Sequence, residues 1–334
     1  MDRAATDIAV SVICVTYNQV GYIRDCLEGI VCQRTTFPIE VIVHDDASTD
    51  GTRQVVLEYA RRYPQLIVPA LEERNRYSQG VEGLENINLP PLRGRYLAYC
   101  EGDDYWTDPN KLQVQYDYME AHPECTLCLH AVSVFDEELG RPRLDKRASG
   151  RERDLTPDEV IVAPWKLQYG TCSFFMRMTG EPMPPEFQGW GVGDWPFEIW
   201  QSLVGTVHYM PRPMATYRAL AAGSWSLSMR DPEKDRAARR LMLEGIDRAE
   251  RFANGAYAEA FAYARSSQRL SYCVAERDLA GLLFGEYRPD ALRIGGMRAF
   301  YALVKCVLPT SVCRRLGRLK RLVGSWSVRA RGAA

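Results

Sequence analysis

IEVIVHDDASTDGT, residues 39–52, joins an apolar run to two adjacent carboxylates and then to the start of a helix. The run at 39–43 is rich in β-branched residues and predicts a buried strand. A turn followed by a capped helix over 52–62 explains the later residues. It leaves Asp45 and Asp46 without a structural role. A carboxylate at a strand end can accept hydrogen bonds from a nucleobase N–H or a ribose hydroxyl, so we favour nucleotide contact.

Two other stretches show the same pattern of a buried strand that ends in polar residues. They are IAVSVICVTYN, residues 8–18, and YLAYCEGDDYWTD, residues 96–108. Helices are expected over 21–33 and 52–62, with a third strand at 66–70. This alternation predicts an α/β fold with a parallel sheet and helices on both faces. Ligands of such sheets bind at the carboxyl ends of the strands, where these polar residues converge.

Asp103 and Asp104 follow the strand expected over 96–100. Burying like charges is costly unless a cation or donor neutralises them. One alternative is a helix cap, but Asp108 is the better cap for the helix expected over 111–121. Mg²⁺ and Mn²⁺ are typically held by one or two carboxylates plus substrate phosphates. We therefore predict that Asp103 and Asp104 bind a divalent cation.

The bulk composition is that of a globular protein with a sizeable core. The chain has 334 residues, 46% of them hydrophobic and 25% charged, and its net charge of −1 gives no argument for nucleic acid. Several of the ten cysteines lie in apolar runs, as reduced core thiols do, and ordinary core thiols are also favoured for the CxxC pair Cys125 and Cys128. The N-terminus lacks a signal-peptide pattern, and no stretch approaches the ~20 apolar residues of a membrane span. These features predict a cytoplasmic protein.

The second half of the chain is expected to be mixed and then helical. Strands are expected at 126–135 and 171–178, a polar loop at 141–153, a helix at 194–203, an extended segment at 206–217 and helices over 231–290. The tail between 299 and 331 spaces leucines between basic residues. Such a basic amphipathic helix can lie on an anionic membrane surface, or can pack one face on the domain.

Four motifs in this order carry a resemblance to a known family: VSVICVTYNQ, VIVHDDASTDGT, LAYCEGDDYWTDPNKLQ and GDWP. Together they make residues 8–226 similar to GT-A glycosyltransferases of family 2. The resemblance implies a mixed, mainly parallel sheet flanked by helices, with a helical C-terminal extension. It places a glycosyltransferase domain at 1–226, with a nucleotide-binding half at about 8–110 and an acceptor half at 111–226. The helical C-terminal region is then 227–334.

The family resemblance also implies a nucleotide-sugar donor, with a UDP-sugar favoured, a Mg²⁺ or Mn²⁺ cofactor and inversion at the anomeric carbon. Asp103 and Asp104 match the family's DXD-type metal motif. The segment RNRYSQG, residues 74–80, resembles a loop that lies near the donor. The residues that we expect to bind the nucleotide are Thr16, Tyr17, Asn18, Asp45, Asp46, Asn75, Arg76 and Asp103.

On the acceptor side, Asp194 in GDWP resembles the family's catalytic base, although it can also cap a helix. Trp190 and Trp195 can stack on a sugar or belong to the core. Arg218 can offset charge on the leaving diphosphate. Leu220 stands where many relatives carry a histidine that touches the metal or the diphosphate, which puts one metal ligand in doubt.

The sequence thus predicts a metal-dependent inverting glycosyltransferase that acts on a glycan or lipid-linked glycan in cell-surface polysaccharide or lipopolysaccharide assembly. Two alternatives stay open. The missing histidine suggests a glycan-binding or scaffold protein without activity. A nucleotidyltransferase also uses carboxylates and metal, but it would usually show a Gly-rich phosphate loop after the first strand. A dinucleotide dehydrogenase is disfavoured because no GxGxxG follows that strand.

Overall fold

A computed structural model describes residues 7–318 apart from 80–88, 168, 310 and 314. Its strands are β1 (Val10–Thr16), β2 (Ile39–Asp45), β3 (Ile67–Leu71), β4 (Tyr96–Tyr99), β5 (Tyr105–Trp106), β6 (Cys125–Asp136), β7 (Arg141–Lys146), β8 (Arg153–Leu155), β9 (Phe175–Arg177) and β10 (Thr206–Ala219). Its helices are α1 (Ile23–Val31), α2 (Thr52–Arg62), α3 (Lys111–Ala121), α4 (Pro157–Ile161), α5 (Ala163–Lys166), α6 (Asp194–Val204), α7 (Trp225–Ser228), α8 (Pro232–Phe252), α9 (Ala258–Glu276), α10 (Leu279–Leu283), α11 (Arg288–Ile294) and α12 (Gly296–Val307), with short 3₁₀ turns at η1 (Tyr77–Gln79), η3 (Thr171–Ser173) and η4 (Pro185–Phe187).

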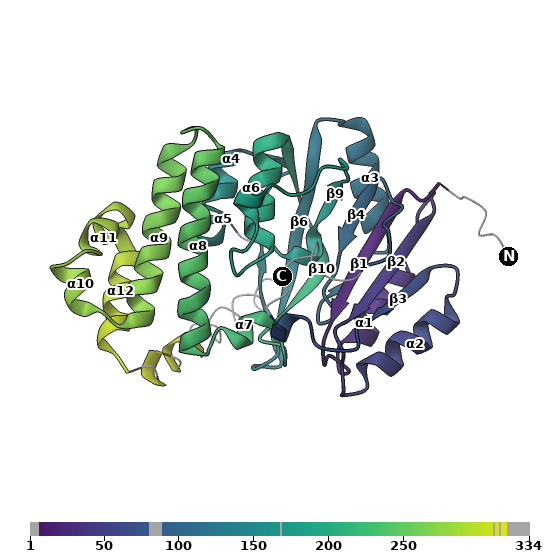
Figure 1. The fold of residues 1–334 in the computed structure, drawn as a ribbon, viewed down its shortest axis with the longest axis horizontal. Helices are drawn as coiled ribbons and strands as arrows, with labels where there is room; N and C mark the ends of the chain where they lie inside the picture. The colour runs from purple at the N-terminus through teal and green to yellow at the C-terminus, as the bar shows by residue number, and fades with distance from the viewer. Residues whose placement is uncertain (1–6, 80–88, 168, 310, 314, 319–334) are drawn as a thin grey trace, which may run out of the picture.

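One mixed sheet runs through the molecule in the order β3-β2-β1-β4-β9-β6-β10-β5. The neighbours β3, β2, β1 and β4 are parallel, as the alternation of strands and helices predicts. Antiparallel pairing enters with β9, which lies between β4 and β6. The carboxyl ends of β1, β2 and β4 therefore meet at one edge of the sheet, which Figure 1 shows at the lower side of the view.

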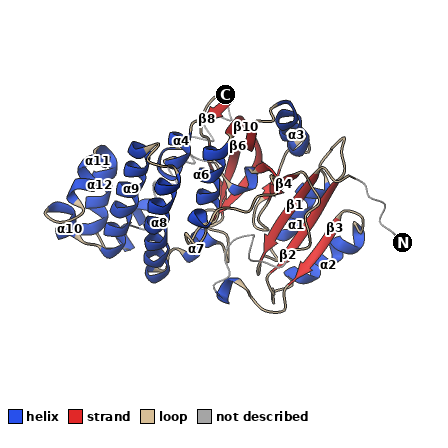
Figure 2. Ribbon diagram, turned by 45° about the horizontal axis from the view of Figure 1, so that its top comes forward, coloured by secondary structure: helices blue, strands red, loops and turns tan. Residues whose placement is uncertain are grey.

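The two faces of the sheet are buried against different sets of helices. Along β1, Val10, Val12 and Cys14 join an apolar cluster that includes side chains of α1, α2 and α3. Ile13 points the other way, into a cluster with residues of α4, α6, α8 and α9. Because successive side chains of a strand alternate between faces, a continuous apolar run is what a strand covered on both faces requires. Figure 2 shows helices on both sides of the strands.

The helices α8 to α12 form the end of the molecule opposite β1 to β3 (Figure 1). Helix α8 packs against α6 and α9, which ties this region to the sheet. A small apolar cluster of its own, which includes Leu270, Cys273 and Cys306, holds α9 to α12 together. The expected helical C-terminal region is therefore confirmed. A domain boundary at 226 stays a prediction.

Sequence patterns predicted β6 and β10 in the second half of the chain but missed β7 and β8. Residues 141–153, expected as a loop, contain β7 and the first residue of β8. The alternation of apolar and polar residues that would indicate a strand is hard to see here, because an edge strand can carry charged side chains on its exposed face. The expected strand at 171–178 is divided into the turn η3 and the short strand β9. The sequence also predicts a loop and a helix over 71–93, and residues 80–88 of this range lie outside the described residues.

Substitution of Gly29 tests how closely α1 must approach β5, the short strand that follows Asp103 and Asp104. A Cβ atom at this position would lie 2.6 Å from the backbone oxygen of Trp106 in β5. Alanine normally stabilises a helix by about 1 kcal/mol relative to glycine. Here, however, its Cβ atom would clash with backbone atoms of β5, which cannot move aside as a side chain can. We expect Gly29→Ala to lower the free energy of unfolding by about 1–3 kcal/mol in chemical denaturation.

The matched control is Gly21→Ala, because a Cβ there would meet no atom within 4 Å. It should change stability by less than about 0.5 kcal/mol. Equal effects of the two substitutions would show that the approach of α1 to β5 imposes no constraint.

Candidate active site

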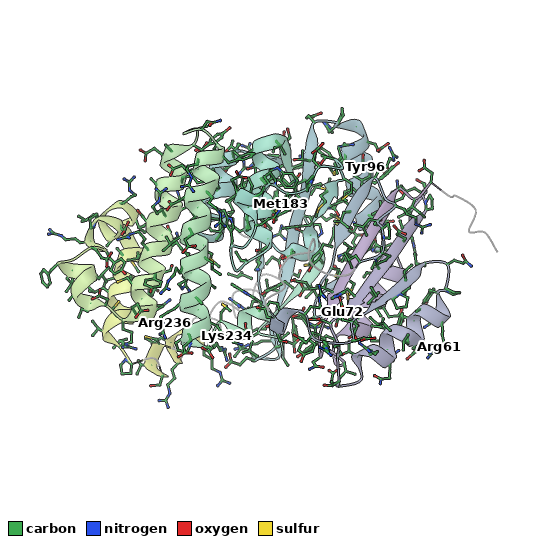
Figure 3. All side chains as sticks on the ribbon, viewed as in Figure 1. Arg61, Glu72, Tyr96, Met183, Lys234 and Arg236 are labelled. Atoms are coloured by element: carbon green, nitrogen blue, oxygen red, sulfur yellow. The ribbon has the colours of Figure 1, made fainter. Side chains whose placement is uncertain are left out.

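The polar residues expected at the site lie where β1, β2 and β4 end. Figure 3 labels Glu72, just after β3, and Tyr96, the first residue of β4, at opposite ends of the parallel strands. The candidate site lies toward the Glu72 end. Thr16 is the last residue of β1 and Asp45 the last of β2, and they are register partners. The prediction that these strand ends converge is thus borne out by the fold.

Asp45 is fully buried, with one oxygen satisfied and the other without a partner. Its Oδ2 accepts hydrogen bonds from Arg53 Nε at 2.8 Å and from the backbone N–H of Ser48 at 3.3 Å. Its Oδ1 has no hydrogen-bond partner among the described residues. A buried acceptor left unpaired is costly. This oxygen is therefore suited to accept a hydrogen bond from a ligand N–H or O–H.

Asp46 organises the loop after β3. Its two carboxylate oxygens accept the backbone N–H groups of Arg76 at 2.6 Å and Tyr77 at 3.1 Å. The side-chain amide of Asn75 donates to the Asp46 carbonyl at 3.3 Å. The structure thus brings Asn75 and Arg76 beside Asp46, as expected for one site. The Asp46 side chain contributes by shaping this loop.

The loop after β1 is tied to the loop after β2. Asn18 has a left-handed backbone, with φ of 50°, and its side-chain oxygen accepts the Thr49 N–H at 2.8 Å. The Asn18 N–H in turn donates to Ser48 Oγ at 2.9 Å. The neighbouring Tyr17 is exposed. Asn18 thus fixes the wall of the site, and Tyr17 presents a ring on its surface.

The acidic loop after β4 lies directly against the end of β1. The Gly102 N–H donates to the Val15 carbonyl at 2.8 Å, which continues the β1–β4 pairing. A Cβ atom on Gly102 would lie 2.6 Å from the Gln19 side-chain oxygen and 2.7 Å from Thr16 Oγ1. Only glycine allows this approach. Thr16 is thereby placed next to the loop that carries Asp103 and Asp104.

Arg218 holds the acidic pair in position from β10. Its backbone N–H donates to Asp104 Oδ1 at 2.9 Å, and its Nη1 donates to the Asp103 carbonyl at 3.0 Å. The rest of the guanidinium forms ion pairs with Asp25 at 2.5 Å and Glu137 at 3.1 Å. The Arg218 side chain is therefore engaged by protein groups on all sides. Its observed contacts position the acids.

The acidic loop carries more negative charge than the protein neutralises. Burial, reinforced by the charge of Asp103, raises the pKa of Asp104 to about 7. Burial also raises the pKa of Asp103. The pKa of Glu101 is raised well above its ordinary value, first by burial and then by the negative charges of Asp104, Asp103 and Asp194. Asp104 Oδ2 is buried without a hydrogen-bond partner in the described chain, although the Cys172 thiol lies near enough to affect its pKa.

These oxygens suit a hard divalent cation, which favours carboxylate ligands and would relieve the repulsion. Within the described residues, no group of three or more His, Cys, Asp or Glu side chains is arranged to hold a metal ion. A cation at Asp103 and Asp104 would therefore need ligands from a substrate or from water.

Asp194 is the first residue of α6 and faces the same group of acids. The helix has Gly193 at its N-cap and no side-chain capping bond, so the capping alternative is not realised. Asp194 Oδ1 accepts the Trp195 N–H at 2.8 Å, and Oδ2 accepts a long hydrogen bond of 3.4 Å from Thr171 Oγ1. The carboxylate is partly exposed and is close enough to raise the pKa of Glu101. It can therefore reach a substrate at this edge.

Trp190 and Trp195 lie in the core, in accordance with the second alternative that the sequence left open. Trp190 is 1% exposed and Trp195 is 4% exposed. Their rings meet edge to face at 5.3 Å, and Trp165 packs on Trp195 in the same way. Neither tryptophan presents an open ring face to a sugar. Their packing instead fixes the start of α6, from which Asp194 projects.

The sequence interpretation missed two groups of this site. Lys146 lies at the end of β7. Burial lowers the pKa of its ammonium, and the negative charges of Asp104, Asp194 and Glu101 partly oppose this shift. It was overlooked because its segment was expected to be a loop. Glu198, one turn after Asp194 on α6, is buried and accepts a 2.9 Å hydrogen bond from Tyr169. The signal for Glu198 was its spacing of four from Asp194.

The cysteines behave as expected for reduced thiols. All ten are free, and Cys125 and Cys128 are both buried. The stretch around them is the strand β6, as the sequence predicts.

Comparison with known proteins identifies the family. The sequence profile of Glycosyl transferase family 2 matches residues 11–180, which include every strand end described above. The chain belongs to this family.

Curated relatives agree with this assignment. Rv1520, an uncharacterized protein of Mycobacterium tuberculosis, is 39% identical to this chain over 225 residues, 67% of this chain. The match covers 63% of the length of Rv1520. The glucosyltransferase WfgD of Escherichia coli, named for UDP-Glc and α-D-GlcNAc-diphosphoundecaprenol, is 34% identical over 113 residues, 34% of this chain and 42% of WfgD.

A solved structure shows the same fold. Residues 1–349 of TarS from S. aureus, crystallised in complex with UDP, align with a TM-score of 0.55 and 18% identity. The alignment covers 90% of this chain and 81% of the TarS chain. The mixed sheet flanked by helices is thus the GT-A fold.

Asp104 provides a test of the uncompensated charge. A carboxyl whose folded pKa is raised, here to about 7, destabilises the protein as the pH rises from the unfolded pKa of ~4 through the folded value. In EDTA, Asp104→Asn should therefore raise the free energy of unfolding on the order of 1–3 kcal/mol at pH 8. At about pH 3 or below, where the carboxyl is largely protonated in both states, the gain should vanish.

Asp117→Asn on α3 is the control, because Asp117 is exposed and should show no such pH dependence. Both variants would be compared by urea denaturation at each pH. A loss of stability of Asp104→Asn at pH 8 would show that the carboxylate is a structural ligand of the fold.

Proposed function

We propose that this protein is a metal-dependent inverting glycosyltransferase that moves a sugar from a nucleotide-sugar donor to a glycan or lipid-linked glycan. The observation that carries the proposal is the position of Asp103 and Asp104. They form an adjacent, buried and under-neutralised acidic pair at the end of β4, beside the ends of β1 and β2. Family membership supports a transfer reaction in which a diphosphate leaves.

The donor nucleoside would bind between the loops after β1, β2 and β3. Asp45 Oδ1, buried without a partner in the described chain, would accept a hydrogen bond from the nucleobase or the ribose. Thr16, Asn18, Asp46, Asn75 and Arg76 would shape the pocket, and Tyr17 offers an exposed ring. A UDP-sugar is the favoured donor, since TarS was crystallised with UDP and WfgD is named for UDP-Glc.

Mg²⁺ or Mn²⁺ would be held by Asp103 and Asp104, together with the donor diphosphate. When bound, such an ion supplies charge neutralisation for the phosphates and for the two carboxylates. The Arg218 backbone N–H keeps Asp104 Oδ1 in place, which leaves Oδ2 as the atom without a partner in the described chain. Leu220 does not supply the ligand that a histidine would.

Asp194 would act as the base. It takes the proton of the acceptor hydroxyl as that oxygen attacks the anomeric carbon from the side opposite the diphosphate, so the configuration inverts. Its partly exposed carboxylate at the start of α6 suits this role. The buried packing of Trp190 and Trp195 would orient it. The proposed acceptor class is supported by the name of WfgD, which includes a lipid-linked sugar, α-D-GlcNAc-diphosphoundecaprenol.

The test is donor turnover with UDP-, GDP- and dTDP-sugars, with and without Mn²⁺. We expect one nucleotide class to be hydrolysed slowly in the presence of Mn²⁺ and not in EDTA. Asp194→Asn should reduce the rate by roughly 10²-fold or more while donor affinity is retained. Glu186→Gln, a change on the turn η4 outside the site, serves as a control.

Binding of a donor without any turnover, unaffected by Asp194→Asn, would favour the alternative of an inactive glycan-binding or scaffold protein. Failure to bind any nucleotide sugar would contradict the proposed function altogether.

We further propose that the protein works at the inner face of the cell membrane as a peripheral protein. Among the described residues, none of the helices is long and apolar enough to span a bilayer. On α12, however, Met297, Phe300 and Val307 are 63%, 55% and 56% exposed, and the opposite side, with Ala302 and Cys306, is buried. This helix falls within the range 299–331 expected to contact a membrane, except for its first turn.

Charge favours an anionic bilayer as the partner of this apolar stripe. After Asp290 the sequence has no acid, whereas ten Lys or Arg follow from Arg293 to Arg331. Apolar side chains flanked by basic residues bind anionic interfaces through both contributions. Part of the basic tail, residues 310, 314 and 319–331, lies outside the described residues.

Vesicle sedimentation tests this placement. The protein should pellet with vesicles that contain phosphatidylglycerol, and less with phosphatidylcholine alone or at high salt. The double substitution Met297→Ser and Phe300→Ser should weaken binding by about tenfold or more. Val204→Ser, at a residue that is 51% exposed on α6, should not. Unchanged binding by the double variant, or a stable dimer that buries α12, would contradict the membrane proposal.

A further inference from the structure

Lys146 brings an ammonium group into the acidic site from a strand that carries none of the family motifs. It is the last residue of β7 and lies opposite Val132 of β6. Its Nζ lies 3.7 Å from the centroid of the Tyr217 ring. The next residue, Arg218, donates its backbone N–H to Asp104. The ring of Tyr217 thus holds the ammonium in the region of Asp104, whose charge acts on it.

The surroundings of Lys146 contain carboxylates from two sides. The charges of Asp104 and Glu101, after β4, and of Asp194, on α6, all act on its ammonium. Within the described part of the chain, however, it forms neither a hydrogen bond nor an ion pair. An ammonium has three N–H donors. A partly buried cation with unused donors, in the middle of a site, is suited to an anionic ligand.

Arg218 is the other cation beside the acidic pair, and its donors are already used. Its guanidinium is paired with Asp25 and Glu137 and donates to the Asp103 carbonyl. Turning it toward a ligand would break these contacts and release the loop that it holds. Lys146 can reach a ligand without losing a hydrogen bond to any described residue.

We propose that Lys146 binds the terminal phosphate of the donor diphosphate, the phosphate from which the sugar departs. This inference rests on the proposed function. Two carboxylates and a diphosphate ester together exceed the charge of one divalent ion. A further cation close to Asp104 would offset part of this excess, and charge-assisted hydrogen bonds to phosphate are among the stronger polar contacts.

The role follows from where charge moves during transfer. The acceptor oxygen forms a bond to the anomeric carbon and gives its proton to Asp194. The bond between that carbon and the phosphate oxygen breaks, and its electron pair stays on the oxygen. The terminal phosphate thus gains one negative charge. An ammonium already placed at this oxygen stabilises the transition state more than the bound donor.

Calorimetric titration with a diphosphate and its monophosphate isolates the contact. UDP, GDP and dTDP are first titrated on the wild type with Mn²⁺, and the nucleotide that binds is chosen together with its monophosphate. Lys146→Met should weaken diphosphate binding by about tenfold to a hundredfold. Monophosphate affinity should change by less than about twofold, since the monophosphate lacks the terminal group. Lys146→Arg should restore most of the diphosphate affinity.

Lys166→Met is the matched control. Lys166 also lies over a tyrosine ring, 4.1 Å from the centroid of Tyr263, but it is exposed and lies outside the acidic site. It should change neither affinity. Should Lys146→Met fail to show a cooperative thermal transition, Lys146→Gln is titrated in its place.

An equal loss for both nucleotides, or no loss for either, would overturn the role of Lys146 while the proposed function stands. A wild-type protein that binds none of the diphosphates would overturn the proposed function, and this inference with it.

Discussion

Repulsion between carboxylates at the end of β4 is the constraint on which the site depends. Asp103 and Asp104 are buried side by side, with Glu101 close by. A fold selected only for stability would replace such a group, because burying an uncompensated charge costs several kcal/mol. The protein nevertheless retains this acidic pair and holds it in place by hydrogen bonds from Arg218. This combination is typical of a site that is completed by a cation and an anionic substrate.

The GT-A fold supplies that support through elements distant in sequence. The parallel pairing of β1 with β2 and β4 aligns the three strand ends. The close approach of Gly102 to Thr16 locks the acidic loop against β1. From the other half of the sheet, β10 contributes Arg218, and α6 contributes Asp194. In the proposed function, the donor side and the acceptor side would therefore meet over the same acids.

The sequence predicted the parts of this site that lie within single continuous segments of the chain. The apolar runs before Thr16, Asp45 and Asp103 predicted strands, and their polar ends predicted a shared edge. Contacts between distant segments were not predictable. Nothing in the sequence shows that the Arg218 guanidinium forms ion pairs with Asp25 and Glu137. Lys146 escaped notice for a related reason: its strand is recognisable only beside β6, and its ring partner comes from β10.

Manganese uptake tests the central claim most directly. Free Mn²⁺ can be followed by electron paramagnetic resonance while UDP, GDP or dTDP is added to the protein at pH 8. With the matching nucleotide, the wild type should take up Mn²⁺, and the double variant Asp103→Asn, Asp104→Asn should not. Equal uptake by the two proteins, or none by the wild type with any of the nucleotides, would contradict the claim that this acidic pair exists to share a dication with a diphosphate.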